Sequence, residues 1–206
     1  MELHTVSVLD FIRELGSSAP APGGGSVAAM NGSTAAALIE MVANLTIGKT
    51  KYESVQEEMK TIQTQMCQVK VDFIHYINKD SVAFMELMGA FKLPKETDEE
   101  KHIRKEEIQR TTKQAALVPF EIGVLAASLL PLAETVIVKG NSNAITDGAI
   151  AVINARAAVK SAFLNVRINL GSIQDQEFVD TMNTRMSKIE ATLDEEEKRL
   201  LSLVQL

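Results

Sequence analysis

Tryptophan is absent from this chain, tyrosine occurs only twice, and aromatic residues fill 4% of its 206 positions. Sheet folds draw heavily on aromatic and β-branched residues, whereas the alanine, leucine, methionine, glutamate and lysine that are common here favour helices. The composition argues against a β-sandwich or barrel and predicts an all-α protein. Hydrophobic residues make up 46% of the chain, so the sequence is apolar enough for a sizeable core and is not typical of disorder.

Cysteine and histidine are scarce. Cys67 is the single cysteine, which excludes a disulfide framework and a cysteine-based zinc site. The three histidines, His4, His75 and His102, lie far apart in the sequence, and none belongs to an H-E-x-x-H pattern. We therefore expect no metal site.

Positive charge is also in deficit: the net charge is −6, and the charged residues are spread along the chain. This distribution excludes the basic surface of a nucleic-acid-binding protein, and no cluster suits anionic lipid. The N-terminal residues have an amphipathic pattern and no signal-peptide core. In the most apolar stretch, 115–138, the longest central charge-free run is 122–133, too short to span a bilayer. We expect a soluble, cytoplasmic protein without a membrane or nucleic-acid partner.

Helical spacing of apolar residues, interrupted by glycine and proline, sets the expected elements. The fourth expected helix has kinks at Pro119 and Pro131. No repeat or linker divides the chain, so we predict one domain over residues 1–206, a helical bundle of five to seven helices, some of them long and kinked. The expected helices cover 5–15, 26–47, 53–91, 96–139, 144–170 and 175–203.

A proline- and glycine-rich loop precedes the second expected helix. It reads Pro20-Ala21-Pro22-Gly23-Gly24-Gly25-Ser26. Glycine lets a ligand or another backbone come close, Ser26 is a good helix N-cap, and free N–H groups at a helix start suit an anion or a polar ligand edge. Two interpretations stay open, a tight turn between crossing helices and a ligand cradle. A P-loop is the poorer interpretation because the G-K-[ST] ending is missing.

Small residues recur every three or four positions in the helix expected at 26–47. Such a stripe lets a neighbouring helix approach closely, either at the centre of a bundle or at a subunit contact, so a homodimer is plausible. Glu40 is the only charge in this helix, and a solvated or paired carboxylate is favoured over a catalytic one. Lys49, Lys51 and Tyr52 follow, as a surface turn or as a clamp for an anionic group.

Polar residues follow one side of the helix expected at 144–170. Asp147 and Asn165 are eighteen residues apart, or five turns, so they point the same way, and Asn169 lies one turn further on. This stripe lines a cavity or forms hydrogen bonds between helices, and both interpretations stay open. Arg167 lies roughly opposite.

Several motifs together carry a family resemblance. The chain is similar to the formiminotransferase-cyclodeaminase C-terminal family, which includes formiminotetrahydrofolate cyclodeaminase domains and stand-alone bacterial methenyltetrahydrofolate cyclohydrolases. The resemblance implies an all-helical, dimer-forming enzyme of folate one-carbon metabolism without a metal or redox cofactor. The matching motifs, in chain order, lie at 20–29, 44–52, 80–84, 91–95, 140–147 and 165–170.

The resemblance implies hydrolysis of 5,10-methenyltetrahydrofolate to 10-formyltetrahydrofolate, an expectation favoured because these 206 residues hold no separate formiminotransferase domain. The alternatives are a cyclodeaminase, which releases ammonia from formiminotetrahydrofolate, and a helical dimer that binds folate without turnover. Asp147 and Asp80 are the expected catalytic carboxylates, one near the reacting carbon and one on the pterin edge, in an order left open. The expected substrate-binding residues are Gly23, Gly24, Gly25, Ser26, Lys49, Lys51, Tyr52, Asn141, Asn165, Arg167 and Asn169.

Overall fold

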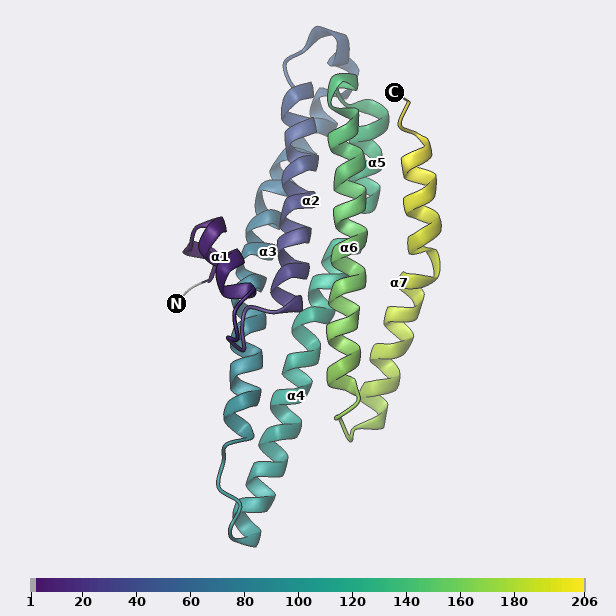
Figure 1. The fold of residues 1–206 in the computed structure, drawn as a ribbon. Coiled ribbons are helices and arrows are strands. Elements are labelled where there is room, and N and C mark those ends of the chain that lie inside the picture. The colour runs from purple at the N-terminus through teal and green to yellow at the C-terminus, as the bar shows by residue number, and fades with distance from the viewer. Residues whose placement is uncertain (1–2, 206) are drawn as a thin grey trace.

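The computed structural model describes residues 3–205 and folds them into an elongated bundle of helices, with no strand among these residues (Figure 1). The all-α prediction is confirmed. Three short 3-10 segments also occur, at Leu3–Thr5, Thr50–Val55 and Ser142–Ala144. The α-helices are α1 (Val8–Leu15), α2 (Gly24–Thr46), α3 (Gln56–Ala90), α4 (Asp98–Ala127), α5 (Leu130–Lys139), α6 (Ile145–Leu170) and α7 (Gln176–Ser202).

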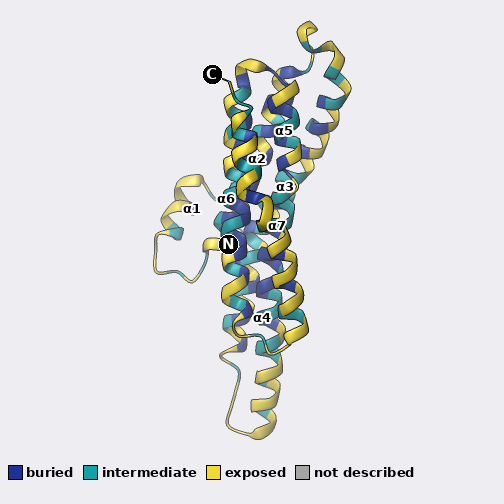
Figure 2. Ribbon diagram, turned by 90° about the vertical axis from the view of Figure 1, so that its right-hand side faces the viewer, coloured by how far each residue is buried: buried dark blue, intermediate teal, exposed yellow. Residues whose placement is uncertain are grey.

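Four long helices form the centre of the bundle. α2 packs against α3 and α6, and α4 packs against the same two helices. α5 covers the upper part of α6 and α2, while α7 lies along α6 and α4 (Figure 1). α1 stands outside this group and projects from the bundle (Figure 2).

Small residues make up most of the buried face of α2 and half of that of α6, which explains how closely the central helices pack. Short side chains allow neighbouring backbones to approach, and larger residues such as Phe73 and Phe163 then fill the remaining space. The close packing expected from the sequence is confirmed. The small buried residues are Gly25, Ser26, Ala28, Ala29, Gly32, Ala35, Ala36 and Ala43 on α2, and Gly148, Ala151, Ala155, Ala158 and Ala162 on α6.

Three helical stretches are long and apolar enough, by length and composition, to cross a membrane: Gly24–Thr46, Asp98–Lys139 and Ser142–Leu170. About half of the most apolar window of each is buried inside the bundle, 50%, 56% and 44% respectively. Packing of the helices on one another therefore accounts for much of this apolar character. The expected lack of a membrane partner remains a prediction.

Two details of the expected helices were wrong. Ser26 does not cap its helix, because α2 already begins at Gly24 and its N-cap residue is Gly23. The single helix expected at 96–139 is divided, since α4 runs on through Pro119 to Ala127 and the chain turns before α5. Pro131 stands in the first turn of α5, where the missing N–H of proline removes no helical hydrogen bond.

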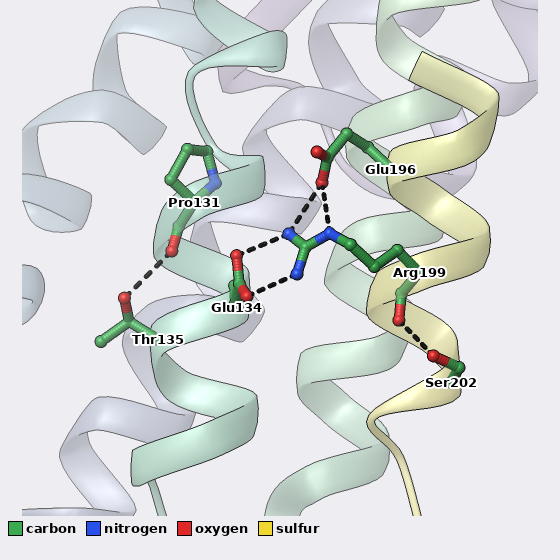
Figure 3. A network of polar contacts seen from close by, with 6 residues as sticks. All are labelled: Pro131, Glu134, Thr135, Glu196, Arg199 and Ser202. Carbon is green, nitrogen blue, oxygen red and sulfur yellow. Dashed lines mark hydrogen bonds and ion pairs between the residues drawn. The ribbon is translucent and has the colours of Figure 1, made fainter. Parts of the chain in front are cut away.

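α7 is held on the bundle by an apolar row and by ion pairs. Met182, Met186, Leu193 and Leu200 are buried at helical spacing against the core. Towards the C-terminal end, the Arg199 guanidinium donates to Glu134 of α5 at 2.6 and 2.7 Å and to Glu196 of its own helix at 2.8 Å (Figure 3). Because these charged groups are partly exposed, the apolar row supplies most of the docking energy.

Candidate active site

A small cavity lies at the N-terminus of α2. Its volume is about 140 Å³, and its walls come from the glycine loop, α3, α4 and α6. Six of the residues expected at the site meet here, namely Gly23, Gly24, Gly25, Asp80, Asn165 and Asn169. We call these residues, together with Ser26, the glycine-loop group.

Close contacts explain the glycines of this loop. A Cβ atom on Gly25 would lie 2.0 Å from Oδ1 of Asp80, closer than any real contact, and one on Gly24 would lie 3.0 Å from Nδ2 of Asn165. Gly23 has no heavy atom within 4 Å of such a position. The loop therefore lets side chains of α3 and α6 press against the start of α2, as the crossing interpretation requires, and the same loop forms one wall of the cavity.

The Asp80 carboxylate is held at the start of α2. Oγ of Ser26 lies 3.1 Å from Oδ2 of Asp80, so a side-chain hydrogen bond joins α2 to α3 here. The carboxylate thus lies against the first turn of α2, where the helix dipole favours a negative charge. Burial raises the pKa of Asp80, and hydrogen bonding from Ser26 opposes that rise. Asp80 thus combines a fixed position with a tendency to hold a proton.

Two amides of α6 complete the cavity. Nδ2 of Asn165 donates to the Ser161 carbonyl at 2.9 Å, and Nδ2 of Asn169 donates to the Asn165 carbonyl at 2.9 Å and to the Ala115 carbonyl of α4 at 3.0 Å. The two side-chain oxygens accept no hydrogen bond from the residues that the structure describes. They are free to accept one from a ligand or a water molecule.

A second group of expected residues lies at the other end of α6. Oη of Tyr52 accepts a hydrogen bond from the Ser142 backbone N–H at 3.0 Å, and Nζ of Lys51 lies 3.4 Å from Oγ of Ser142. The hydrogen bonds with Ser142 lower the pKa of Tyr52 to about 8. Lys49 is exposed, and Asp147 is partly exposed in the first turn of α6. We call Lys49, Lys51, Tyr52 and Asp147 the basic-turn group.

Asn141 lies beside this group, and its polar atoms are occupied within the chain. Its backbone N–H donates to Oγ1 of Thr46 at 2.8 Å, its Nδ2 donates to the Leu45 carbonyl at 3.0 Å, and its Oδ1 accepts from the Asn143 N–H at 3.1 Å. These bonds join the end of α2 to the start of α6. Asn141 therefore orders the turn that carries the basic-turn group.

The two groups are far apart within one chain. Asp147 and Asn165 share a side of α6, but the eighteen residues between them correspond to about 27 Å along the helix axis. The expected polar stripe therefore does not line one cavity. Among its members, Asn169 forms a hydrogen bond to another helix, and Asn165 bonds within α6.

Two charged residues from the sequence analysis form pairs outside both groups. Arg167 pairs with Glu190 of α7, on the side of α6 that faces α7, so the structure does not bring it to the cavity. Glu40 pairs with Lys70 of α3, which confirms the interpretation of a paired carboxylate.

Some residues of the cavity were missed in the sequence analysis. Pro20 and Ala21 line it from the loop, Ser81 and Phe84 from α3, and Ala115 from α4. The first four fall inside motifs that carry the family resemblance, so those motifs gave a usable signal. Ala115 gave none, since it is one more alanine in a helix.

Among residues 3–205, the described side chains include no group of three or more histidine, cysteine, aspartate or glutamate residues that could hold a metal ion.

Comparison with known proteins shows which family the chain belongs to. The family model described as formiminotransferase-cyclodeaminase matches residues 7–188. The chain belongs to the formiminotransferase-cyclodeaminase family. The match covers the glycine-loop group and the basic-turn group alike, so both groups are parts of the family domain.

Relatives within this family carry two names. The chain is 41% identical over 185 residues to a methenyltetrahydrofolate cyclohydrolase from Methylorubrum extorquens, covering 90% of this chain and 88% of that protein. It is 31% identical to the formimidoyltransferase-cyclodeaminase of Rattus norvegicus over 91% of this chain but only 35% of that longer protein. The chain thus spans about a third of such animal relatives.

A solved structure of the family has the same fold. The crystal structure of formiminotetrahydrofolate cyclodeaminase from Thermotoga maritima superposes with a TM-score of 0.88 at 30% sequence identity. The superposition covers 98% of this chain and 97% of that one. The arrangement of helices around the cavity is therefore shared with a cyclodeaminase.

Proposed function

We propose that this chain is a methenyltetrahydrofolate cyclohydrolase, a folate one-carbon enzyme that hydrolyses 5,10-methenyltetrahydrofolate to 10-formyltetrahydrofolate. The observation that carries the choice is the 41% identity to a cyclohydrolase along nearly the full length of both chains. The relatives named for cyclodeaminase activity are 28–34% identical. The cavity beside Asp80 supports the same chemistry, as follows.

The carbon that reacts is already electrophilic. The reaction therefore needs a group that moves protons between the attacking water and N5. Water attacks the carbon that bridges N5 and N10, a C–O bond forms, and the C–N5 bond breaks with its electron pair returning to N5. A carboxylate at this point takes one proton from the water and delivers it to N5, and the second proton, from the hydroxyl of the tetrahedral intermediate, is released to solvent as the formyl C=O forms. Asp80 suits this exchange because burial raises its pKa while Ser26 fixes its position. The Asn165 and Asn169 side chains would orient the water or the ring.

We propose that no metal or redox cofactor takes part. The bridging carbon belongs to a cation, so its electrophilicity does not depend on a Lewis acid, and the hydrolysis involves no electron transfer. Enzyme treated with a chelator and dialysed is expected to keep its full rate. A rate that falls and is restored by one divalent metal would contradict this part of the proposal.

The glycine-loop cavity needs a further wall to hold a folate. Its volume of about 140 Å³ is below the roughly 300–1,000 Å³ of typical small-molecule sites. The basic-turn group offers cations for the anionic glutamate tail, yet it lies at the far end of α6 in the same chain. We propose that a second copy of the chain supplies it, in a homodimer.

An exposed apolar surface on α2 and α6 supports such a dimer. These two helices lie side by side in Figure 1, and large apolar side chains stand exposed along both. Large apolar side chains exposed on two adjacent helices are typical of an interface between proteins. The exposed residues are Met41 and Leu45 on α2, and Ile150, Ile153, Leu164 and Ile168 on α6.

An antiparallel arrangement would bring the two groups together. Position 156 lies midway between Asp147 and Asn165 in the sequence, and position 157 lies midway between the exposed Ile150 and Leu164. A two-fold axis that crosses α6 near this point pairs the start of one α6 with the end of the other. The partner subunit's Asp147 would then approach the glycine-loop group, and each dimer would hold two composite sites.

The cyclodeaminase reaction is the second candidate, favoured by the match to the Thermotoga maritima enzyme over 97% of its chain. There N10 attacks the formimino carbon and ammonia leaves, and the same carboxylate would move the protons. A dimer that binds folate without turnover is the third possibility. We also propose a cytoplasmic location, in keeping with a soluble folate substrate.

A paired assay tests the proposal. Purified enzyme is incubated with 5,10-methenyltetrahydrofolate, with loss of the methenyl chromophore as the readout, and separately with formiminotetrahydrofolate, with ammonia release as the readout. We expect turnover of the first substrate and little ammonia from the second. Ammonia release alone would favour the cyclodeaminase, and tight folate binding without either reaction would contradict an enzymatic function.

A further inference from the structure

A second cleft lies away from the glycine-loop cavity. It has a volume of about 570 Å³ and opens between α3, α4 and α7. It shares no lining residue with the glycine-loop cavity, and it uses no residue of α2 or α6, the helices that carry the proposed dimer surface. Its volume falls within the range of sites for small molecules.

Arg185 of α7 stands at the wall of this cleft and is unusual among the arginines. Each of the other six arginines forms an ion pair with a carboxylate or donates to a backbone carbonyl. Arg185 forms no hydrogen bond or ion pair with any residue that the structure describes. Its guanidinium instead lies 4.4 Å from the centre of the Phe120 ring. Phe120 is almost fully buried and stacks on Phe163, so this support is rigid.

Contact with the ring occupies none of the N–H donors of the guanidinium. These donors match the two oxygens of a carboxylate. Five of the other six arginines form an ion pair within the protein, and Arg104 donates to the Phe91 carbonyl. Arg185 is therefore held in place with its donors open to a ligand.

The other charges of the cleft narrow the class of ligand. Lys79 is already paired with Glu121 at 2.7 Å, and Oη of Tyr76 donates to the same carboxylate at 3.2 Å. Asp72 adds a further negative charge to the lining. Repulsion from these two carboxylates disfavours a multiply charged anion such as phosphate. A ligand with one carboxylate can pair that group with Arg185, and its uncharged part can lie against the rest of the cleft.

The remaining lining is aromatic and apolar. Tyr76 stands on α3, and Val124 and Leu125 stand on α4 beside Phe120. Such a surface favours a flat apolar body attached to the carboxylate. We propose that this cleft is a second ligand site, which binds a small aromatic monocarboxylate through Arg185.

Benzoate and its neutral analogue benzamide test the site. The enzyme labelled with ¹⁵N is titrated with each compound and with inorganic phosphate, and the arginine Nε–H resonances are followed by NMR. Benzoate is expected to shift the Arg185 resonance in a saturable manner and to bind at least about tenfold more tightly than benzamide, with phosphate weaker still.

Two variants and one competitor make the test decisive. Arg185→Gln is expected to lose benzoate binding by about the same tenfold, whereas Arg110→Gln, a change at an exposed paired arginine of α4, is expected to keep it. Saturating 5-formyltetrahydrofolate is expected to leave the benzoate shift in place. Equal binding of benzoate and benzamide, unchanged binding by Arg185→Gln, or displacement by the folate would each overturn the proposal. This outcome is independent of the enzyme assays.

Discussion

Gly25 carries the tightest steric constraint at the candidate site, and it gives the first prediction. Because an added Cβ would lie 2.0 Å from Oδ1 of Asp80, Gly25→Ala must move that carboxylate away from Ser26. A shift of this size at a reacting group typically costs on the order of 100-fold in rate. Steady-state kinetics with 5,10-methenyltetrahydrofolate measures the loss.

Gly23→Ala is the matched control, since no heavy atom lies within 4 Å of the new methyl group. Gly23 has φ −134° and ψ −159°, an extended conformation that alanine also adopts. We expect a smaller loss of turnover from this variant than from Gly25→Ala. Equal losses from both substitutions would show that the loop, rather than its contact with Asp80, matters for activity.

Asp80 gives a prediction about stability and pH. Burial raises its pKa above the ordinary value of 3.8, so the folded state binds this proton more tightly than the unfolded state does. The resulting stabilisation is fully present below the unfolded pKa and disappears as pH rises through the folded pKa. Asp80→Asn lacks this dependence, so its melting temperature relative to the wild type is expected to rise as the pH increases above the ordinary carboxyl value of about 4. A constant or falling difference would contradict a raised pKa.

At the scale of single helices, substitutions in α7 compare the contribution of apolar packing to stability with that of ion pairing. Leu200 is fully buried, and Leu200→Ala is expected to destabilise the protein by about 2–5 kcal/mol. The neighbouring Arg199→Ala breaks the exposed contacts with Glu134 and Glu196 shown in Figure 3 and is expected to have a much smaller effect that fades with added salt. Denaturant unfolding at low and high salt compares the two. A larger loss of stability from Arg199→Ala than from Leu200→Ala would contradict the view that apolar packing supplies most of the docking energy of α7.

The helices themselves could largely be predicted from the sequence. The expected 144–170 and 175–203 agree closely with α6 and α7, because apolar spacing and breakers define them. The start of α2 could not be predicted, since its first turn lies against the Asp80 carboxylate of another helix, a contact that no local pattern indicates. The division between α4 and α5 was also missed, since a proline can stand either inside a helix or in its first turn.

The candidate site shows the limit of helical spacing as a guide. Five whole turns fix the direction in which Asp147 and Asn165 point, but they also fix a separation of about 27 Å. Spacing within one helix therefore predicted a shared side and could not predict a shared cavity. The meeting of Gly25 with Asp80 depends on the crossing of α2 and α3, which no local pattern encodes.

At the scale of the whole molecule, the proposed active site is built from two subunits of a dimer. Asp80→Asn and Asp147→Asn are each expected to lose most activity while keeping the fold, because each removes one carboxylate of the same site. Near-normal turnover of Asp147→Asn would remove that residue from catalysis. Circular dichroism and gel filtration serve as controls for folding and assembly.

Mixing these two variants tests the shared site most directly. The subunits are exchanged at equal concentration, and native mass spectrometry of differently tagged chains measures the mixed dimer. In that dimer one site carries both substitutions and the other carries neither, so the mixture is expected to recover roughly one quarter of wild-type cyclohydrolase activity. Activity that stays at the level of the separate variants, although mixed dimers have formed, would contradict a site built from two subunits.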